Sequence, residues 1–264
     1  MQWNWQSRRN EMLVAERHRE IVAVVNKRGS IRVTELAQLF HVTEETIRRD
    51  LEKLESQGKL QRSHGGAVRT ESTERETPFS EREIAHVKEK SAIAREAVKR
   101  VEEYDSIILD ASTTAWQMAR LLPNIRLTVV TNAIKVAMEL ANRSRITVIS
   151  TGGTLSPESL SYVGPLAERS LETYHVNKLF FSCSGLHTEH GLSDPTEWQA
   201  VLKRRMMSIA GQCYLLVDHS KFGVQAFSTI ADVAGVHEVI TDDKVDSDSV
   251  KQLEQVGVSV TLAT

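Results

Sequence analysis

Hydrophobic residues in the first part of the chain recur with the three- and four-residue spacing of amphipathic helices. Ile21, Val22 and Val25 share one face of a helix predicted over Val14–Arg28, and Gly29 lies just beyond its end. A second, short helix is predicted to follow, with Thr34 as its N-cap and Leu36, Ala37 and Phe40 as its inward face. Two helices in quick succession indicate a small helical core.

The third predicted helix follows a turn at His41-Val42 and has well-marked ends. Thr43 is the expected N-cap, and Gly58 can end the helix in a left-handed conformation. Apolar residues at i, i+4 and i+7 form a stripe that faces the core: Ile47, Leu51 and Leu54. The opposite side is polar and comprises Glu45, Arg49 and Glu52, flanked by Thr46, Arg48 and Lys53.

After this helix the pattern changes to that of a β-hairpin. Lys59–Ser63 and Ala67–Arg69 read as short strands, and His64-Gly65-Gly66 supplies the permissive backbone that the turn needs. Basic residues lie on both sides of the tip. Helix, turn, helix and hairpin in this order predict a winged helix-turn-helix, which is a DNA-binding architecture.

Arg48 and Arg49 could contact guanine edges or phosphates, and Thr46 could contact a phosphate or a thymine methyl group. An arginine pair on an amphipathic helix is usually only a solvated face, but here turn, cap, basic face and wing coincide. The candidate DNA-binding residues are Thr34, Thr43, Thr46, Arg48, Arg49, Lys53, Arg62, His64, Gly65 and Gly66.

From residue 70 the chain changes character. Residues 70–79 contain Pro78 and mostly polar side chains, which predicts a linker, and Ser80–Glu103 is predicted to be one long amphipathic helix. Short apolar runs then alternate with helical segments, which predicts an α/β fold with a largely parallel sheet covered by helices. The predicted strands are 107–109, 127–130, 146–149, 179–181, 214–217, 238–240 and 258–262, and the predicted helices are 116–122, 133–141, 199–209 and 249–255.

Polar residues directly follow these apolar runs, where open α/β sheets bind their ligands. Small hydroxyls and glycines before a helix can present O–H and N–H groups to a phosphate, Lys221 offers a cation, and Asp110 or Asp218 can accept hydrogen bonds from sugar hydroxyls. Each motif alone is weak, because such strings also form turns and caps. The candidate effector-binding residues are Asp110, Ser112, Thr113, Thr114, Thr131, Asn132, Gly152, Gly153, Ser184, Lys203 and Lys221.

Charge separates the two parts of the chain. The 264 residues suit about two domains and carry a formal net charge of -2. Residues 1–70 hold 13 Lys and Arg against 9 Asp and Glu, a net +4, and the remainder holds 20 against 26, a net -6. One basic domain that meets DNA phosphates and one acidic domain that does not are therefore expected.

Cys183 and Cys213 lie in apolar strand contexts, which favours buried reduced thiols and a cytoplasmic protein. No segment has the pattern of a signal peptide or a membrane span, and residues 1–12 are predicted to be an extension, with Met12 as a possible alternative start. The paired histidines His187 and His190 are spaced as in a polar loop, so no metal is expected.

The stretch VTELAQLFHVTEETIRRDLEKLESQGKLQRSHGGA resembles the N-terminal winged helix of the DeoR family of bacterial sugar-metabolism regulators. The strings DASTT, TN, STGGTL, VDHSKFG and ITDD resemble the sensor domain of the same family, whose fold is similar to ribose 5-phosphate isomerase A and CoA-transferases. The resemblance covers 13–262 and implies an extension at 1–12, a DNA-binding domain at 13–69, a linker at 70–79 and a sensor domain at 80–264.

The resemblance also implies roles for the residues after the strands. It implies that Ser112, Thr113 and Thr114 hold a phosphate, that Lys221 reaches the ligand, and that Asp110, Thr131, Asn132, Gly152 and Gly153 line the site. The chain departs from the family in SCSGL, where many members have an acid at the position of Ser184. Glu197, Lys203 and Arg204 on the next helix are either further contacts or a solvated face.

The expected function is a transcriptional repressor of a carbohydrate-catabolism operon that a phosphorylated sugar releases from double-stranded operator DNA. The expected assembly is a homo-oligomer, a dimer or a tetramer, with no cofactor other than the effector and no membrane partner. An activator of the same type is the alternative. A sugar-phosphate isomerase is a weaker one, because enediol chemistry needs a carboxylate base that SCSGL lacks.

Overall fold

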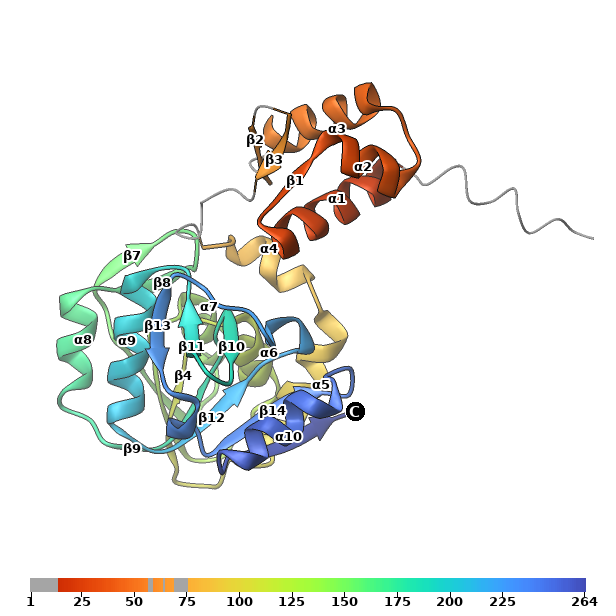
Figure 1. Ribbon diagram of the computed structural model, residues 1–264. Helices are drawn as coiled ribbons and strands as arrows, with labels where there is room; N and C mark the ends of the chain where they lie inside the picture. The colour runs from red at the N-terminus through yellow and green to blue at the C-terminus, as the bar shows by residue number, and fades with distance from the viewer. Residues whose placement is uncertain (1–13, 57–58, 64, 69–75) are drawn as a thin grey trace, which may run out of the picture. The chain divides into compact units, whose positions relative to one another are not determined.

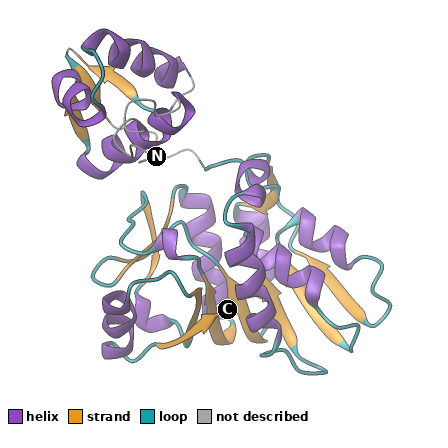
Figure 2. Ribbon diagram, turned by 90° about the vertical axis from the view of Figure 1, so that its right-hand side faces the viewer, coloured by secondary structure: helices purple, strands orange, loops and turns teal. Residues whose placement is uncertain are grey.

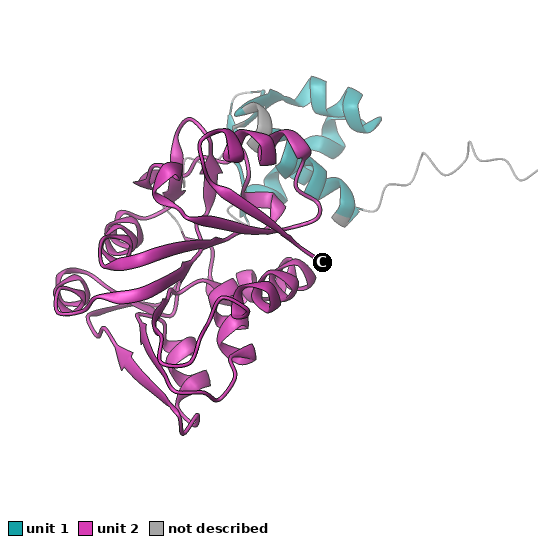
Figure 3. Cartoon of the chain, turned by 90° about the horizontal axis from the view of Figure 1, so that it is seen from below, with its two compact units in different colours: residues 1–73 teal, residues 74–264 magenta. Residues whose placement is uncertain are grey.

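The computed structural model describes residues 14–56, 59–63, 65–68 and 76–264. The predicted extension 1–12, the helix end at Gly58, the hairpin residue His64 and the first part of the linker lie outside these ranges. The chain divides into two compact units, Met1–Thr73 and Glu74–Thr264 (Figure 3). The division therefore falls within the segment predicted as a linker.

Within its described residues, the first unit holds three helices and a small antiparallel sheet (Figure 1). The elements are α1 (Val14–Arg28), β1 (Ser30–Arg32), α2 (Val33–Phe40), α3 (Glu44–Ser56), β2 (Gln61–Ser63) and β3 (Gly66–Val68). The strand order is β1-β3-β2, so β3 pairs on one side with β2, as the hairpin predicted, and on the other with β1. The strand β1 was not predicted.

The small core forms as the helical spacing predicts, because the stripe of Ile47, Leu51 and Leu54 is buried. The complete cluster comprises Ile21, Val25, Ile31, Val33, Leu36, Ile47, Leu51, Leu54, Leu60 and Ala67. The prediction that Thr34 caps α2 is wrong: the helix begins at Val33, and its N-cap is Arg32, which makes no side-chain cap hydrogen bond. Strand β1 runs directly into this helix, so its last residue, Arg32, is also the N-cap.

The second unit begins with two helices where the sequence predicted one. They are α4 (Phe79–Ile84) and α5 (Val87–Val98). Between them Ala85 is extended, and His86 has a left-handed φ of 52°. Ile84 and Val87, which the single helix would have buried, are 76% and 43% exposed. The apolar spacing thus continues from α4 to α5 although the helix itself is interrupted at Ala85-His86.

A seven-stranded parallel sheet forms the centre of the second unit, in the order β15-β14-β12-β9-β4-β5-β6. Its strands are β4 (Ser106–Leu109), β5 (Leu127–Thr131), β6 (Ile146–Ser150), β9 (Val176–Phe181), β12 (Ala210–Leu216), β14 (Glu238–Asp242) and β15 (Ser259–Ala263). The predicted α/β class and the predicted parallel sheet are confirmed. All carboxyl ends consequently meet at one edge.

Helices cover both faces of this sheet (Figure 2). Along β4, Ile108 faces a core that includes residues of α8, α9 and α10, whereas Ile107 and Leu109 face a core that includes residues of α5, α6 and α7. Burial on both faces explains why the strands read as continuous apolar runs. The helices are α6 (Thr113–Leu121), α7 (Ile134–Leu140), α8 (Pro165–Leu171), α9 (Glu197–Ser208) and α10 (Ser247–Gln255).

The second unit also contains short elements that the sequence did not predict. They are the hairpin β7 (Thr154–Ser156) and β8 (Ser161–Val163), the sheet β10 (Gly185–His187), β11 (Gly191–Asp194) and β13 (Ser228–Ala231), and the 3-10 turns η2 (His219–Lys221) and η3 (Val233–Gly235). No helix in the described ranges is long and apolar enough to cross a membrane.

Candidate functional site

The turn between α2 and α3 sets the geometry of the DNA-binding candidate. His41 adopts a left-handed φ of 52° at the end of α2, and the amide of Val42 donates to the carbonyl of Ala37 at 3.1 Å. Thr43 caps α3 as predicted, because its Oγ1 accepts from the amide of Thr46 at 3.2 Å. The two helices are thereby joined by a short, hydrogen-bonded turn of the helix-turn-helix type.

The outer face of α3 presents its arginines to solvent. The side chains of Arg48 and Arg49 are 59% and 78% exposed, and they pair along the helix with Glu44 at 3.0 Å and Glu45 at 3.4 Å. Exposed ion pairs of this kind contribute little to stability, so a DNA phosphate or base can replace the glutamates as the partner of each arginine. Lys53 lies one turn further along and is also exposed.

The two glycines of the hairpin are needed for its shape. Gly65 has a φ of 89°, and a Cβ on Gly66 would lie 2.3 Å from the carbonyl oxygen of Ile31 in β1. Next to them, the backbone amide of Arg62 donates to Glu55 of α3 at 2.8 Å, while its guanidinium stays exposed. The wing is therefore fastened to both β1 and the recognition helix.

Asp50, whose role the sequence did not predict, ties α3 to α1. Its carboxylate accepts from Arg17 Nε at 2.6 Å and lies 2.9 Å from His18 Nε2. Asp50 and Arg17 are 6% and 9% exposed, so this pair is buried. Asp50 lies three residues after Ile47 and four before Leu54, so helical spacing places it beside the buried stripe of α3. The sequence does not show which cation neutralises a buried acid there, and the approach of α1 supplies it.

Arg49→Ala is expected to relax base discrimination at one position of the operator by about 1–3 kcal/mol, because an arginine that reads a base edge specifies that base. Competition binding against a set of single-base operator variants measures this effect. Arg204→Ala, which removes an exposed arginine of the second unit, is the control and should change nothing. Equal weakening on every variant would instead make Arg49 a phosphate contact.

In the second unit, Lys203 connects three elements at the carboxyl edge of the sheet. Its Nζ lies 2.6 Å from Asp194 at the end of β11, 2.7 Å from the carbonyl of Ser182 after β9, and 3.4 Å from Asp110 after β4. Burial opposes its charge, but Asp194 and Asp110 outweigh burial and raise the pKa of Lys203. The interpretation of Lys203 as part of a solvated helix face is therefore wrong, whereas its neighbour Arg204 is exposed.

Asp194 is the second residue that sequence reasoning missed. It is 3% exposed, and its Oδ1 accepts from the amide of Ser184 at 2.9 Å. Asp194 of β11 thus places a carboxylate next to Ser184, the position at which SCSGL lacks an acid. However, this carboxylate is held by Lys203 and a backbone amide, so it is not positioned as a free general base.

Three predicted phosphate contacts gather at the N-terminus of α6. Ser112 is its N-cap and accepts from the amide of Ala115 at 3.0 Å. Thr113 and Thr114 follow, both buried, and their hydroxyls make no hydrogen bond to any residue that the structure describes. Asp110 holds this turn through the amide of Ser112 at 3.1 Å. The turn presents donors and a positive dipole end to an anion.

Asn132, after β5, carries a buried polar atom without a partner. Its Nδ2 donates to the carbonyl of Tyr162 at 3.1 Å, but Oδ1 has no hydrogen bond within the described chain. Leaving such an acceptor unsatisfied costs about 1–3 kcal/mol. In contrast, the Thr131 hydroxyl is fully used, because it donates to Leu109 at 2.7 Å and accepts from Ala133 at 3.0 Å. Thr131 shapes the loop, and Asn132 Oδ1 is available to a ligand.

The remaining predicted residues take two different roles. Gly152 and Gly153 follow β6 with φ of 60° and 118°, and a Cβ on Gly153 would meet the carbonyl of Val163 at 2.8 Å. Lys221, in η2, is half-buried, and its ammonium has no hydrogen bond among the described residues. Its charge helps to lower the pKa of Asp218, against the effect of burial and together with the hydrogen bonds from Ser220.

The start of the second unit contacts the helices that carry these groups. Gln199 of α9 donates to Glu76 at 3.4 Å, and the ring of Phe79 meets that of Trp116 in α6 edge-to-face at 5.8 Å. Burial raises the pKa of Glu76, against the lowering effect of Arg82 and the more distant Lys203. Glu76 and Phe79, which lie at the C-terminal end of the predicted linker, thus contact α9 and α6.

Comparison with known families agrees with this architecture. A model of the DeoR-like helix-turn-helix domain matches residues 17–73, and a model of the DeoR C terminal sensor domain matches residues 85–243. The chain belongs to the DeoR family. The family predicted from the sequence is confirmed, and this DeoR-family protein is a transcriptional regulator that combines a DNA-binding domain with a sensor for a small molecule.

Similar DeoR-family proteins span nearly the whole chain. The uncharacterized HTH-type transcriptional regulator YulB of Bacillus subtilis is 60% identical over 95% of this chain and 97% of its own length. The L-fucose operon activator of Haemophilus influenzae is 38% identical over 89% of this chain and 94% of its own. A protein of Escherichia coli O157:H7, provisionally named an aga operon transcriptional repressor, is 33% identical over 94% and 93%. All three are named as regulators rather than enzymes.

The structural similarity to enzymes is weak. Ribose 5-phosphate isomerase A of Methanocaldococcus jannaschii aligns with a TM-score of 0.38 and 19% identity, over 50% of this chain and 53% of its own. A likeness at this level carries no statement about activity.

Proposed function

We propose that this regulator represses a carbohydrate-catabolism operon and that a phosphorylated sugar, bound at the carboxyl edge of the parallel sheet, releases it from its operator. The observation that carries the proposal is the unsatisfied Asn132 Oδ1, buried one strand away from the Thr113 and Thr114 hydroxyls. A sugar hydroxyl would satisfy the amide oxygen, and a phosphate would take the hydroxyls.

The phosphate end of the ligand is the more specific part of the proposal. Thr113 and Thr114 offer two hydroxyl donors at the positive end of α6, and Lys221 offers a cation two strands away, beyond β12. Asp110 cannot take a phosphate, since it is an acid that already accepts from two backbone amides. It orients the turn instead, so an anion meets donors rather than another carboxylate.

The signal would leave the site through the first residues of the second unit. A ligand that shifts α6 changes the contact between Trp116 and Phe79, and one that shifts α9 changes the bond between Gln199 and Glu76. Both contacts are made by residues at the C-terminal end of the predicted linker, Glu76 and Phe79. The ligand alters DNA affinity only if it favours one arrangement by differential affinity.

Operator recognition is proposed to use a homo-oligomer. Two recognition helices of a dimer would then enter successive major grooves about 10–10.5 base pairs apart, with the wings on the neighbouring backbone. A selection from random duplexes should return a pseudo-palindrome with this half-site spacing.

Two other functions follow from specific observations. The L-fucose operon activator among the relatives favours activation as the alternative sign of regulation. The carboxylate of Asp194 beside Lys203 is the one observation that suggests an isomerase-like activity. We consider this function the weaker alternative, because the two groups pair with each other and neither is available to a substrate. Measurable sugar-phosphate isomerase turnover by the purified protein would overturn the view that the site only binds.

A thermal-shift screen of phosphorylated hexoses, pentoses, deoxysugars and polyols, each beside its unphosphorylated counterpart, tests the ligand. At least one phosphorylated compound should raise the unfolding midpoint, since a ligand at about 100 times its Kd adds about 2.7 kcal/mol. Thr113→Val should lose this shift. Thr128→Val, the same substitution near the opposite end of the adjacent strand β5, should keep it. A screen without any stabilising compound would contradict the proposal.

A further inference from the structure

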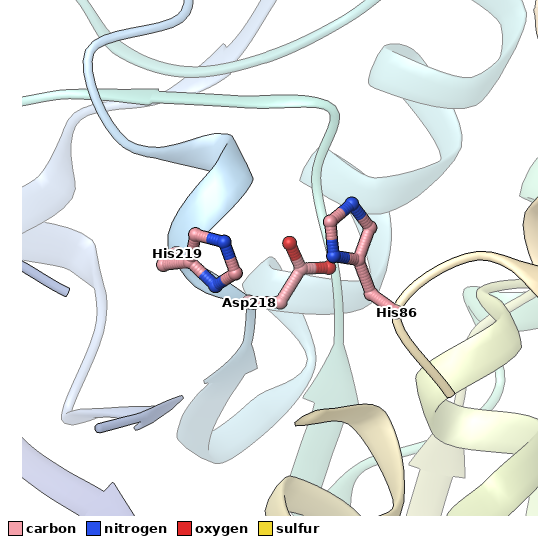
Figure 4. Close-up of side chains that lie close together, drawn as sticks. All are labelled: His86, Asp218 and His219. Atoms are coloured by element: carbon pink, nitrogen blue, oxygen red, sulfur yellow. The ribbon is translucent and has the colours of Figure 1, made fainter. Parts of the chain in front are cut away.

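Two histidines and an aspartate from distant parts of the chain meet beside the sheet edge. His86 lies at the break between α4 and α5, whereas Asp218 and His219 follow β12. One possible ligand atom from each of the three residues lies within 4.8 Å of the other two. Figure 4 shows the Asp218 carboxylate between the two imidazole rings. Their separation in sequence hides this cluster from any search for spaced motifs.

The ring of His219 is oriented from behind by a carboxylate. Its Nδ1 lies 2.9 Å from Asp242 Oδ1, and its backbone amide donates to Asp242 Oδ2 at 2.8 Å. Asp242 is 2% exposed, so this support is buried and fixed. The arrangement leaves Nε2 of His219 for another partner. A carboxylate behind a histidine in this way is the usual support of a metal-binding imidazole.

Asp218 has one oxygen engaged and one oxygen available. Its Oδ1 accepts from the amide of Ser220 at 3.0 Å and from the Ser220 hydroxyl, which fixes the carboxylate. Its Oδ2 makes no hydrogen bond to any part of the chain that the structure describes. The Asp218 residue as a whole is 2% exposed, and Oδ2 is the carboxylate oxygen that remains available to a cation.

His86 lies where the backbone leaves the helical conformation between α4 and α5, an interruption that the sequence did not predict. The amide of Lys90 donates to the carbonyl of His86 at 3.0 Å, and the Lys90 ammonium donates to the carbonyls of Arg82 at 2.6 Å and Ala85 at 2.8 Å. The break is thus held from both sides. The exposed His86 ring stands edge-to-face to His219, with ring centroids 5.4 Å apart.

We propose that His86, Asp218 and His219 bind a divalent first-row transition metal ion such as Zn²⁺. Two imidazoles and one carboxylate are a ligand set that such ions prefer, and three protein ligands leave one position open to solvent or to an added anion. The ion would join the α4–α5 break to η2. Lys90 and Lys221 lie close to the cluster and oppose a cation, while Asp242 adds a second negative charge behind it.

Metal-stripped full-length protein titrated with Co²⁺ tests the site through the visible absorption of the bound ion, with Zn²⁺ competing. Wild type should bind one tightly held ion with a d–d spectrum of low coordination number. His86→Ala should weaken binding at least about tenfold, and Asp242→Asn should weaken it about 10–100-fold by removing the support of His219. His86 is exposed, so its variant should fold, which the thermal midpoint checks.

The control separates this cluster from the other histidine pair. His187, Glu189 and His190 also lie within ligand distance of one another, at the exposed turn between β10 and β11. His190→Ala should leave the tightly bound ion unchanged. Loss of the ion in His190→Ala, equal affinity in wild type and His86→Ala, or the absence of any tightly bound ion would overturn the proposal.

Discussion

Lys203→Met should lower the free energy of unfolding of the second unit by about 3–5 kcal/mol, because it leaves two buried carboxylates without their cation. The side chains of Asp194 and Asp110 are 4% and 1% exposed, so water cannot replace the ammonium. Denaturant unfolding followed by tryptophan fluorescence measures the change, since Trp116 and Trp198 both lie in this unit.

The pH dependence of this deficit follows from the raised pKa of Lys203. A lysine whose pKa is higher in the folded than in the unfolded state stabilises the fold fully below its unfolded value of about 10.4 and loses this effect only as the pH rises through the folded value. The deficit of the variant should therefore stay constant between about pH 6 and pH 9.

A surface lysine provides the matched control for Lys203→Met. Lys251 is 66% exposed and pairs with Asp248 at 3.3 Å on α10, so Lys251→Met should change stability by less than about 0.5 kcal/mol. If Lys203→Met cost less than about 1 kcal/mol, Lys203 would not be the charge that joins the three elements at the sheet edge.

Asp50→Ala should open the DNA-binding unit to a comparable extent, because it leaves Arg17 buried between α1 and α3 without a counter-charge. A loss of about 3–5 kcal/mol corresponds to amide exchange that is faster by about a hundredfold to a few thousandfold. Hydrogen–deuterium exchange of the full chain measures this in α1 and α3. Operator binding should weaken in parallel.

The exposed neighbour Glu52 on the same helix serves as the comparison for Asp50. Glu52→Ala removes an acid of the same charge from the solvent side of α3, so exchange in α1 and α3 should stay within about twofold of wild type. Unchanged exchange in Asp50→Ala would show that the contact with Arg17 is not what fastens α3.

Periodicity predicted the regular part of this molecule. The stripe of Ile47, Leu51 and Leu54 and the apolar runs of the sheet follow from burial on one face or on two, and both are readable from local spacing. The break at Ala85-His86 could not be predicted, because it depends on Lys90 and on the packing of α5 rather than on a glycine or a proline. Strand β1 is three residues long and carries too little pattern.

The residues of the candidate site were likewise predictable only where a local pattern marks them. Asp110, the Thr113-Thr114 pair and Asn132 directly follow strands, so a rule about strand ends finds them. Asp194 comes from a short strand that lies outside the main sheet, and its importance is apparent only from its distance to Lys203. Groups that act through a partner distant in sequence carry no local signal.

The central claim is that a sugar phosphate at the sheet edge controls DNA binding, and fluorescence anisotropy of a labelled operator measures it most directly. With the stabilising sugar phosphate at saturation, the operator Kd of wild type should rise by about 5- to 150-fold, and that of Thr113→Val should not change. A wild-type Kd that stays the same, or that falls, while the ligand is bound would contradict this account.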